Sequence, residues 1–245
     1  MRCAAGQCAS QFAAPWVALH VVMKIALFDL DHTLLDGDTN ILWIQHLAQQ
    51  QLVPPQTVAR QQSYMDMYAQ ERLDMAEYMV FHMDILRTRS MAQWQPIVAH
   101  FVQTELVPRL APEALQAVQA HRAAGHRVAL VTATNSVLAG CLGRVLDMHT
   151  IATEIEVVDG HATGRTVGLP SFRAHKIDRV QQWLGCSLDS ADITESHFYS
   201  DSANDIALLS RVSHPVAVNA DAKLQAEALQ RGWPQRCWKA ATAHA

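Results

Sequence analysis

The 245-residue chain lacks several features that would assign it to a particular class of protein. It contains no uninterrupted apolar run near the ~20 residues that a membrane-spanning helix requires. Its net charge is −4, so it also lacks the basic excess that is typical of proteins that bind nucleic acid. The sequence therefore predicts neither a membrane protein nor a partner of nucleic acid.

Paired cysteines and zinc-binding motifs are missing as well. The five cysteines are widely scattered, odd in number and form no CxxC pair. This usage favours reduced thiols in a cytoplasmic protein. The 13 histidines contain no HExxH or similar ligand spacing, which argues against a zinc site. The sequence thus predicts a cytoplasmic location and no disulfide framework.

Glycine is absent between Gly37 and Gly125, over a stretch whose apolar residues recur at helical spacing. The spacing and the capping residues predict four helices, which begin near Thr39, Val58, Asp74 and Trp94. We expect the last of them to start close to Pro96, because proline favours the first turn of a helix. Residues 37–108 are therefore predicted to form a helical insert.

Outside this insert, predicted strands and helices alternate, as a parallel α/β sheet requires. The predicted strands include residues 24–28, 127–132, 197–200 and 215–219. We expect residues 23–36 and 109–245 to form an α/β core, with the insert as a second domain. Residues 1–22 are mildly apolar but lack a convincing cleavage site, so we expect a disordered leader before a natural start at Met23.

Acidic side chains follow two of the predicted strands. Asp29 and Asp31 come directly after the first strand, and Asp201 and Asp205 follow strand 197–200. The carboxyl ends of parallel strands form the ligand-binding edge of such sheets, so we expect the two clusters to converge there. Buried carboxylates need a cation, and carboxylate oxygens are preferred ligands of Mg²⁺. The pattern predicts phosphate chemistry with a divalent metal.

These carboxylates can divide the work of hydrolysing a phosphomonoester. Asp29 can attack phosphorus and form an aspartyl-phosphate, which splits one difficult step into two. Asp31 can protonate the leaving oxygen and then activate water. We expect Asp29, Asp201 and the carbonyl oxygen of Asp31 to hold Mg²⁺, with Asp205 holding the water molecules of the metal.

Two other residues can contact the phosphoryl group. Thr132 ends a predicted strand and can donate its hydroxyl to a phosphoryl oxygen, although capping of the following helix explains its position equally well. Lys176 opens a predicted helix and can supply a positive charge to the phosphoryl group and Asp29. A solvated surface lysine is the usual alternative at such a position.

Taken together, these motifs resemble the four ordered motifs of the haloacid dehalogenase superfamily of phosphatases. They are DLDHTL from Asp29, then Thr132, Lys176 and SDSANDIALL from Ser200. The resemblance, to the phosphoserine-phosphatase-like branch, implies a Rossmann-like doubly wound parallel sheet with a helical cap inserted after the first strand. It also implies a Mg²⁺-dependent phosphomonoesterase that forms an aspartyl-phosphate, with Asn204 as a contact on the phosphate side.

Asp38 and His82 bear on the substrate. By the same resemblance, Asp38 stands where phosphoserine phosphatases carry a glutamate for the substrate ammonium, although it is also placed to cap a helix. His82 stands where they carry an arginine for the substrate carboxylate, unless it is simply a histidine on the helix surface or at the edge of the core. Ala133-Thr134 replaces a glycine pair of that branch.

The histidine at position 82 and the lost glycine pair both favour a small phosphorylated amine without a carboxylate as the substrate, such as histidinol phosphate. Related bacterial proteins of this branch are described as histidinol-phosphatases. Three alternatives stay open. One is a phosphoserine phosphatase, the second is a phosphotransferase that uses the same aspartyl-phosphate, and the third is a non-catalytic binding protein with this fold. The sequence leaves the oligomeric state open.

Overall fold

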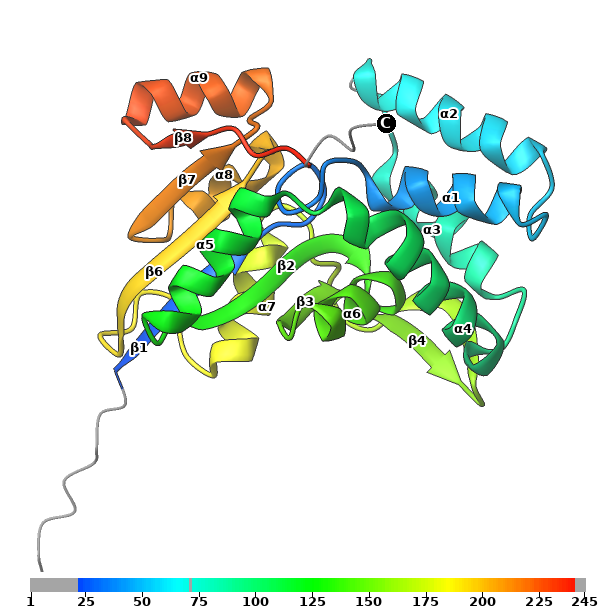
Figure 1. Ribbon diagram of the computed structural model, residues 1–245, viewed down its shortest axis with the longest axis horizontal. Helices are drawn as coiled ribbons and strands as arrows, with labels where there is room; N and C mark the ends of the chain where they lie inside the picture. Colours follow the sequence, from blue (N-terminus) through cyan, green and yellow to red (C-terminus); the bar gives the residue numbers. More distant parts are fainter. Residues whose placement is uncertain (1–21, 71, 241–245) are drawn as a thin grey trace, which may run out of the picture.

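The computed structural model describes residues 22–70 and 72–240, and its centre is a six-stranded sheet (Figure 1). The strand order is β3-β2-β1-β6-β7-β8, and all neighbouring strands are parallel. The strands are β1 (Met23–Phe28), β2 (Arg127–Asn135), β3 (His149–Thr153), β6 (Ile193–Ser200), β7 (His214–Val218) and β8 (Gln235–Arg236). Residues 1–21 of the predicted leader lie outside the described part of the chain.

Helices cover both faces of this sheet. They are α5 (Pro112–Ala123), α6 (Ser136–Val145), α7 (His175–Leu184), α8 (Ile206–Leu209) and α9 (Ala222–Arg231). Ile25 and Leu27 of β1 pack in the apolar cluster of α7, α8 and α9, whereas Ala26 and Phe28 pack in the cluster of α5 and α6. Successive strand side chains point to opposite faces, so the apolar run of β1 is explained by burial on both sides. The predicted doubly wound α/β core is confirmed.

A second, smaller sheet is the antiparallel hairpin of β4 (Ile155–Val158) and β5 (His161–Thr166). Its turn is Asp159-Gly160, and both residues have positive φ angles (49° and 74°). Two consecutive left-handed residues match the twist of a two-residue hairpin turn.

The helical insert after the first strand is also confirmed. It contains α1 (Thr39–Gln49), α2 (Gln56–Ala69), α3 (Met75–Leu86) and α4 (Met91–Phe101), followed by the short helices η1 (Val102–Leu106) and η2 (Val107–Arg109). Trp43, Trp94 and Phe101 form its aromatic centre. The ring centroid of Trp43 lies 5.6 Å from that of Trp94 and 4.9 Å from that of Phe101. One apolar cluster joins these rings to the sheet, so the division into domains at residues 36 and 109 stays a prediction.

The structure decides which residue caps one helix and moves the start of another. Helix α1 is capped by Asp38, whose carboxylate accepts a hydrogen bond from the Ile41 amide (2.9 Å), and not by Thr39. Helix α4 starts at Met91 because Ser90 forms a capping box with Gln93, which places Pro96 inside the helix. None of the helices in the described residues is both long and apolar enough to span a membrane.

Candidate active site

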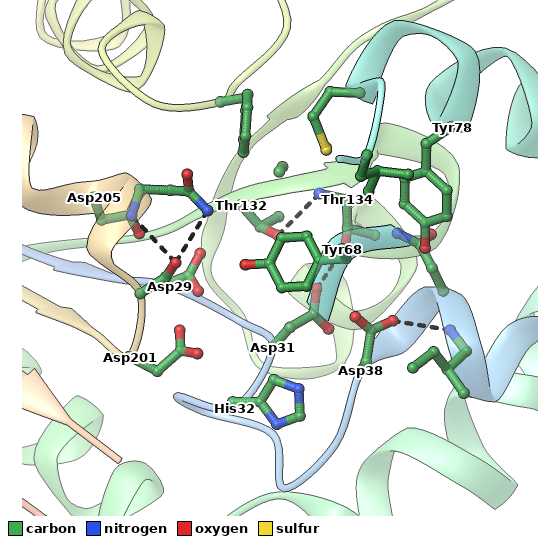
Figure 2. Close-up of a pocket in the computed structure, with 18 of the residues that line it drawn as sticks. Asp29, Asp31, His32, Asp38, Tyr68, Tyr78, Thr132, Thr134, Asp201 and Asp205 are labelled. Carbon is green, nitrogen blue, oxygen red and sulfur yellow. Dashed lines mark hydrogen bonds between the residues drawn. The ribbon is translucent and has the colours of Figure 1, made fainter. Parts of the chain in front are cut away.

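A cavity of about 260 Å³ lies between the carboxyl edge of the sheet and the helical insert. Most of the predicted site residues line it, namely Asp29, Asp31, Asp38, Thr132, Lys176, Asp201, Asn204 and Asp205. Figure 2 shows the carboxylates of Asp29, Asp31 and Asp201 directed toward the same space. The structure therefore brings together residues that lie as far as 176 positions apart in the sequence, as the strand-edge argument predicted.

Lys176 bridges two of these carboxylates. Its Nζ lies 2.8 Å from Asp29 Oδ1 and 2.7 Å from Asp205 Oδ2, and its side chain is only 4% exposed. Burial opposes the charge on Lys176, but the carboxylates of Asp205 and Asp29 outweigh burial and hold the lysine pKa above its usual value. The ammonium group is therefore retained, and the alternative of a solvated surface lysine is wrong.

The carboxylates around this single ammonium group also repel one another. Burial and the charges of Asp205 and Asp31 raise the pKa of Asp29 to about 7, against the opposing attraction of Lys176. Burial and the neighbouring Asp29 and Asp205 raise the pKa of Asp201 to about 9. Because several hard oxygen ligands share one ammonium group, this donor set fits a divalent cation such as Mg²⁺.

Asp205 was predicted among the metal-site residues. Its Oδ2 accepts hydrogen bonds from Lys176 Nζ (2.7 Å) and from Ser200 Oγ (2.7 Å). This oxygen is therefore occupied within the protein. Asp205 can act on a metal only through its other carboxylate oxygen, which agrees with a role in holding water molecules of the metal.

Asp31 is held by two threonines that the sequence argument did not assign to the site. Its Oδ1 accepts hydrogen bonds from the Thr39 backbone amide (2.7 Å) and hydroxyl (2.5 Å), and its Oδ2 accepts one from Thr134 Oγ1 (2.9 Å). Burial and the charge of Asp38 raise the pKa of Asp31 to about 6, although these hydrogen bonds act in the opposite direction. Thr134 could have been found, because it follows Thr132 at the two-residue spacing that places strand side chains on one side.

Thr132 is buried in the cavity wall, inside a strand that continues to Asn135. Its Oγ1 accepts a hydrogen bond from the Thr134 amide (3.1 Å), which leaves the hydroxyl proton to donate into the cavity. The helix that follows is capped by Asn135, which accepts from the amides of Val137 and Leu138 (both 3.1 Å). The alternative that Thr132 caps this helix is therefore wrong.

Asn204 lines the same cavity and also the neighbouring groove. Its side-chain oxygen accepts a hydrogen bond from Arg173 Nε (3.1 Å), and its Nδ2 donates to Ser202 Oγ (3.2 Å). Arg173 has a positive φ of 52° and lines an adjoining groove. Asn204 is therefore held in the cavity wall by hydrogen bonds from and to its side chain.

Asp38 caps a helix and also lines the cavity. One oxygen caps α1, and the residue also lines the cavity, where burial raises the pKa of its carboxyl group. The helix cap and a contact with a bound amine are compatible, because a carboxylate offers about four acceptor sites.

His82 lies in a separate, smaller cavity of about 60 Å³ beside the first. The two cavities share wall residues, namely Asn40, Met75, Tyr78, Ala133 and Phe172. His82 is 7% exposed, and neither ring nitrogen has a hydrogen-bond partner among the described residues. Burial lowers its pKa to about 3, so the imidazole is neutral. The structure thus buries His82, which rules out a position on the helix surface, and leaves its polar atoms unsatisfied.

Comparison with known proteins agrees with this geometry. Residues 26–210 match the haloacid dehalogenase-like hydrolase family. The chain belongs to this family. The predicted resemblance is thereby confirmed, and so is the prediction of an enzyme rather than a binding protein.

Several relatives of this hydrolase have names or known structures. A histidinol-phosphatase of Neisseria meningitidis serogroup C is 35% identical over 217 residues, which are 86% of this chain and 97% of the relative. A phosphoserine phosphatase of Mycobacterium tuberculosis is 29% identical and covers 88% of this chain and 71% of its own. The prediction that this hydrolase is a phosphatase is confirmed.

Solved structures of other proteins share the fold of this hydrolase. A Bordetella pertussis protein of unknown function is 38% identical with a TM-score of 0.81, over 88% of this chain and 98% of the other. A phosphoserine phosphatase carrying a phospho-aspartyl intermediate analogue has a TM-score of 0.59 at 15% identity, over 88% of this chain and 93% of the other. At that identity the likeness concerns the fold alone.

Proposed function

We propose that this hydrolase is a Mg²⁺-dependent phosphomonoesterase that works through an aspartyl-phosphate and acts on histidinol phosphate. The observation that carries the chemistry is the position of Lys176 between Asp29 and Asp205, at the strand edge where Asp31 and Asp201 also lie. An ammonium group there restrains the nucleophile and attracts a phosphoryl group to it.

Asp29 acts as the nucleophile. Lys176 holds its Oδ1, so its Oδ2 attacks phosphorus, forming the acyl-phosphate bond while the bond from phosphorus to the ester oxygen breaks. Asp31 gives a proton to the departing alcohol oxygen. It then takes one from the water that attacks phosphorus and regenerates Asp29.

The metal would be held by Asp29, Asp201 and the carbonyl oxygen of Asp31, with Asp205 on its water molecules. A bound Mg²⁺ supplies charge neutralisation on the phosphoryl oxygens. The hydroxyl of Thr132 and the amide of Asn204 complete the contacts to these oxygens. Thr39 and Thr134 orient Asp31 for both proton transfers.

The charges of the cavity support an amine substrate. Among the described residues that line it, none is an arginine, and Lys176 is already paired with two carboxylates. A substrate carboxylate therefore finds no unpaired guanidinium there, whereas a substrate ammonium can meet Asp38. His82 offers a neutral imidazole with free nitrogens in the adjoining cavity, where a heteroaromatic ring with its own donor and acceptor could bind. The Neisseria relative, named as a histidinol-phosphatase, supports the same choice.

The test is phosphate release in the presence of Mg²⁺ from three matched compounds: histidinol phosphate, phosphoserine and phosphoethanolamine. We expect histidinol phosphate to have the highest kcat/KM and Asp29→Asn to abolish its turnover. Faster turnover of phosphoserine would contradict the substrate. Loss of substrate without release of inorganic phosphate, in the presence of an acceptor alcohol, would show phosphotransfer instead of hydrolysis.

A further inference from the structure

A cluster of histidines lies on the α5 face of the sheet, away from the cavity. His197 and Glu195 project from β6 on the same face, since they are two residues apart in a strand. His121 comes from α5, His126 from the turn before β2, and His214 from the start of β7. Figure 1 shows α5 crossing the sheet over these strands. The four histidines come from four separate segments, so no local sequence motif predicts that they lie together.

The polar atoms of this cluster face one another at short range. His121 Nδ1 lies 2.6 Å from His126 Nδ1, and His197 Nε2 lies 2.8 Å from Glu195 Oε1. His126 Nε2 lies 3.7 Å from the other oxygen of Glu195. His121, His126 and His197 each offer one ring nitrogen, and these three nitrogens lie within 4.8 Å of one another. The side chains of His126 and His197 are only 4% and 14% exposed.

We propose that His121, His126 and His197 form a binding site for a divalent transition metal of the Zn²⁺ type, with the Glu195 carboxylate holding His197 in place. Imidazole nitrogens suit Zn²⁺, Cu²⁺ and Ni²⁺ and not Mg²⁺, which distinguishes this site from the carboxylate cavity. The three histidine nitrogens supply three of the four ligands of a tetrahedral site. Such a metal would tie α5 and the start of β2 to β6.

Metal binding needs only local adjustment. Tetrahedral ligands at Zn–N distances of about 2.0–2.1 Å lie roughly 3.4 Å apart. The two Nδ1 atoms of His121 and His126 would move apart by less than 1 Å, because their hydrogen bond would be replaced by one bond from each nitrogen to the metal. Lys24, whose Nζ lies 2.8 Å from Glu195 Oε2, holds the carboxylate that pairs with His197 Nε2.

His214 forms a second group of possible ligands with Glu195 and His197, and Tyr199 borders the first group. The His214 ring stacks on His197 with centroids 4.4 Å apart, and its Nδ1 is bonded to Ser213 Oγ (2.9 Å). Tyr199 OH lies 2.9 Å from His121 Nε2. This contact fixes the orientation of His121, as outer hydrogen bonds do for metal-bound histidines, and leaves its Nδ1 for the metal.

The experiment uses the full chain without a histidine tag, stripped with a chelator and titrated with Zn²⁺ and Co²⁺ while Mg²⁺ is saturating. We expect one equivalent to bind with micromolar or tighter affinity, a visible spectrum of tetrahedral Co²⁺, and a higher Tm. His197→Gln and Glu195→Gln should weaken binding by tenfold or more. The matched control His161→Gln, at the start of β5, should leave it unchanged.

Two outcomes would overturn the proposal. One is Zn²⁺ binding that is unaffected by His197→Gln and Glu195→Gln but lost in Asp201→Asn, which would place the ion in the carboxylate cavity. The other is a wild-type protein that binds Co²⁺ with an octahedral spectrum or binds no metal outside the carboxylate cavity. This second measurement uses the wild-type protein alone, so it does not depend on the folding of a variant.

Discussion

The carboxylate of Asp31 is held by Thr39, the first residue of helix α1. Both the backbone amide and the hydroxyl of Thr39 donate to Asp31 Oδ1, at 2.7 and 2.5 Å. The proposed acid and base therefore depends for its orientation on the start of α1. If the insert moves to admit substrate, this pair of hydrogen bonds is the direct link between that motion and Asp31.

Replacing Thr39 by valine should lower kcat by about tenfold or more, since a hydrogen bond to a charged group contributes ~1.5–3 kcal/mol. Loss of a donor also raises the pKa of Asp31 further, so the pH profile of kcat should move toward higher pH. Thr39→Ser keeps the hydroxyl and should retain most of the activity. Equal kinetics for the two variants would show that the hydroxyl does not matter.

Asp29→Asn should reduce turnover by about 10⁴-fold or more, as removal of a nucleophile does in other enzymes that form covalent intermediates. The fold should persist, because Lys176 keeps its ion pair with Asp205. Single-turnover assays with labelled substrate should detect phosphate on the wild-type protein and none on the variant. Labelling of Asp29→Asn at the wild-type level would assign the nucleophile to another residue.

Lys176→Met should destabilise the metal-free protein by roughly 3 kcal/mol or more, because it leaves Asp29 and Asp205 buried without their cation. Chemical denaturation in the presence of a chelator measures this. The double variant Lys176→Met, Asp205→Asn should recover part of the lost stability, since it removes one of the two buried carboxylate charges that have no cation. If both proteins were equally unstable, packing of the lysine stem and not its charge would be responsible.

Magnesium should stabilise the protein more as the pH rises. Asp29 and Asp201 have pKa values raised to about 7 and about 9, so the folded metal-free protein binds protons that the unfolded chain has released. Their contribution to stability is therefore present at low pH and is lost as pH rises from about 4 through these values. Because Mg²⁺ replaces the protons, its effect on Tm should grow between about pH 6 and about pH 9.

Thermal melts with and without Mg²⁺ across this range test the point, with Asp201→Asn as the control. The variant should show a smaller Mg²⁺ effect with little pH dependence. A Mg²⁺ effect in the wild-type protein that is the same at every pH would place the ion away from these carboxylates.

His82→Leu should raise stability and impair substrate binding at the same time. A buried polar group without a partner costs about 1–3 kcal/mol, so an apolar side chain of similar size removes that cost. If the imidazole contacts the substrate ring, KM for histidinol phosphate should rise by about tenfold, the size of a lost hydrogen bond. KM for phosphoethanolamine, which carries the amine and phosphate but no ring, should not change. Improved stability with unaltered KM for both compounds would make His82 a purely structural residue.

Local pattern was sufficient to predict the sheet and the position of its acidic residues. The apolar run of β1 is buried on both faces, and parallel strands end at one edge, so Asp29 and Asp201 had to approach each other. Helix starts were harder to predict. Asp38 and Thr39 are adjacent and both are good caps, and the choice between them depended on Asp31, which takes up the Thr39 hydroxyl.

By itself, then, the sequence determined the fold class and the acidic edge, because both follow from hydrophobic periodicity and the order of motifs along the chain. Only the tertiary structure decided that Lys176 is buried between two carboxylates, that His82 has no polar partner, and that dispersed histidines meet on β6. These are properties of side chains brought together from distant segments. Their burial and charge depend on neighbours that no local stretch of sequence specifies.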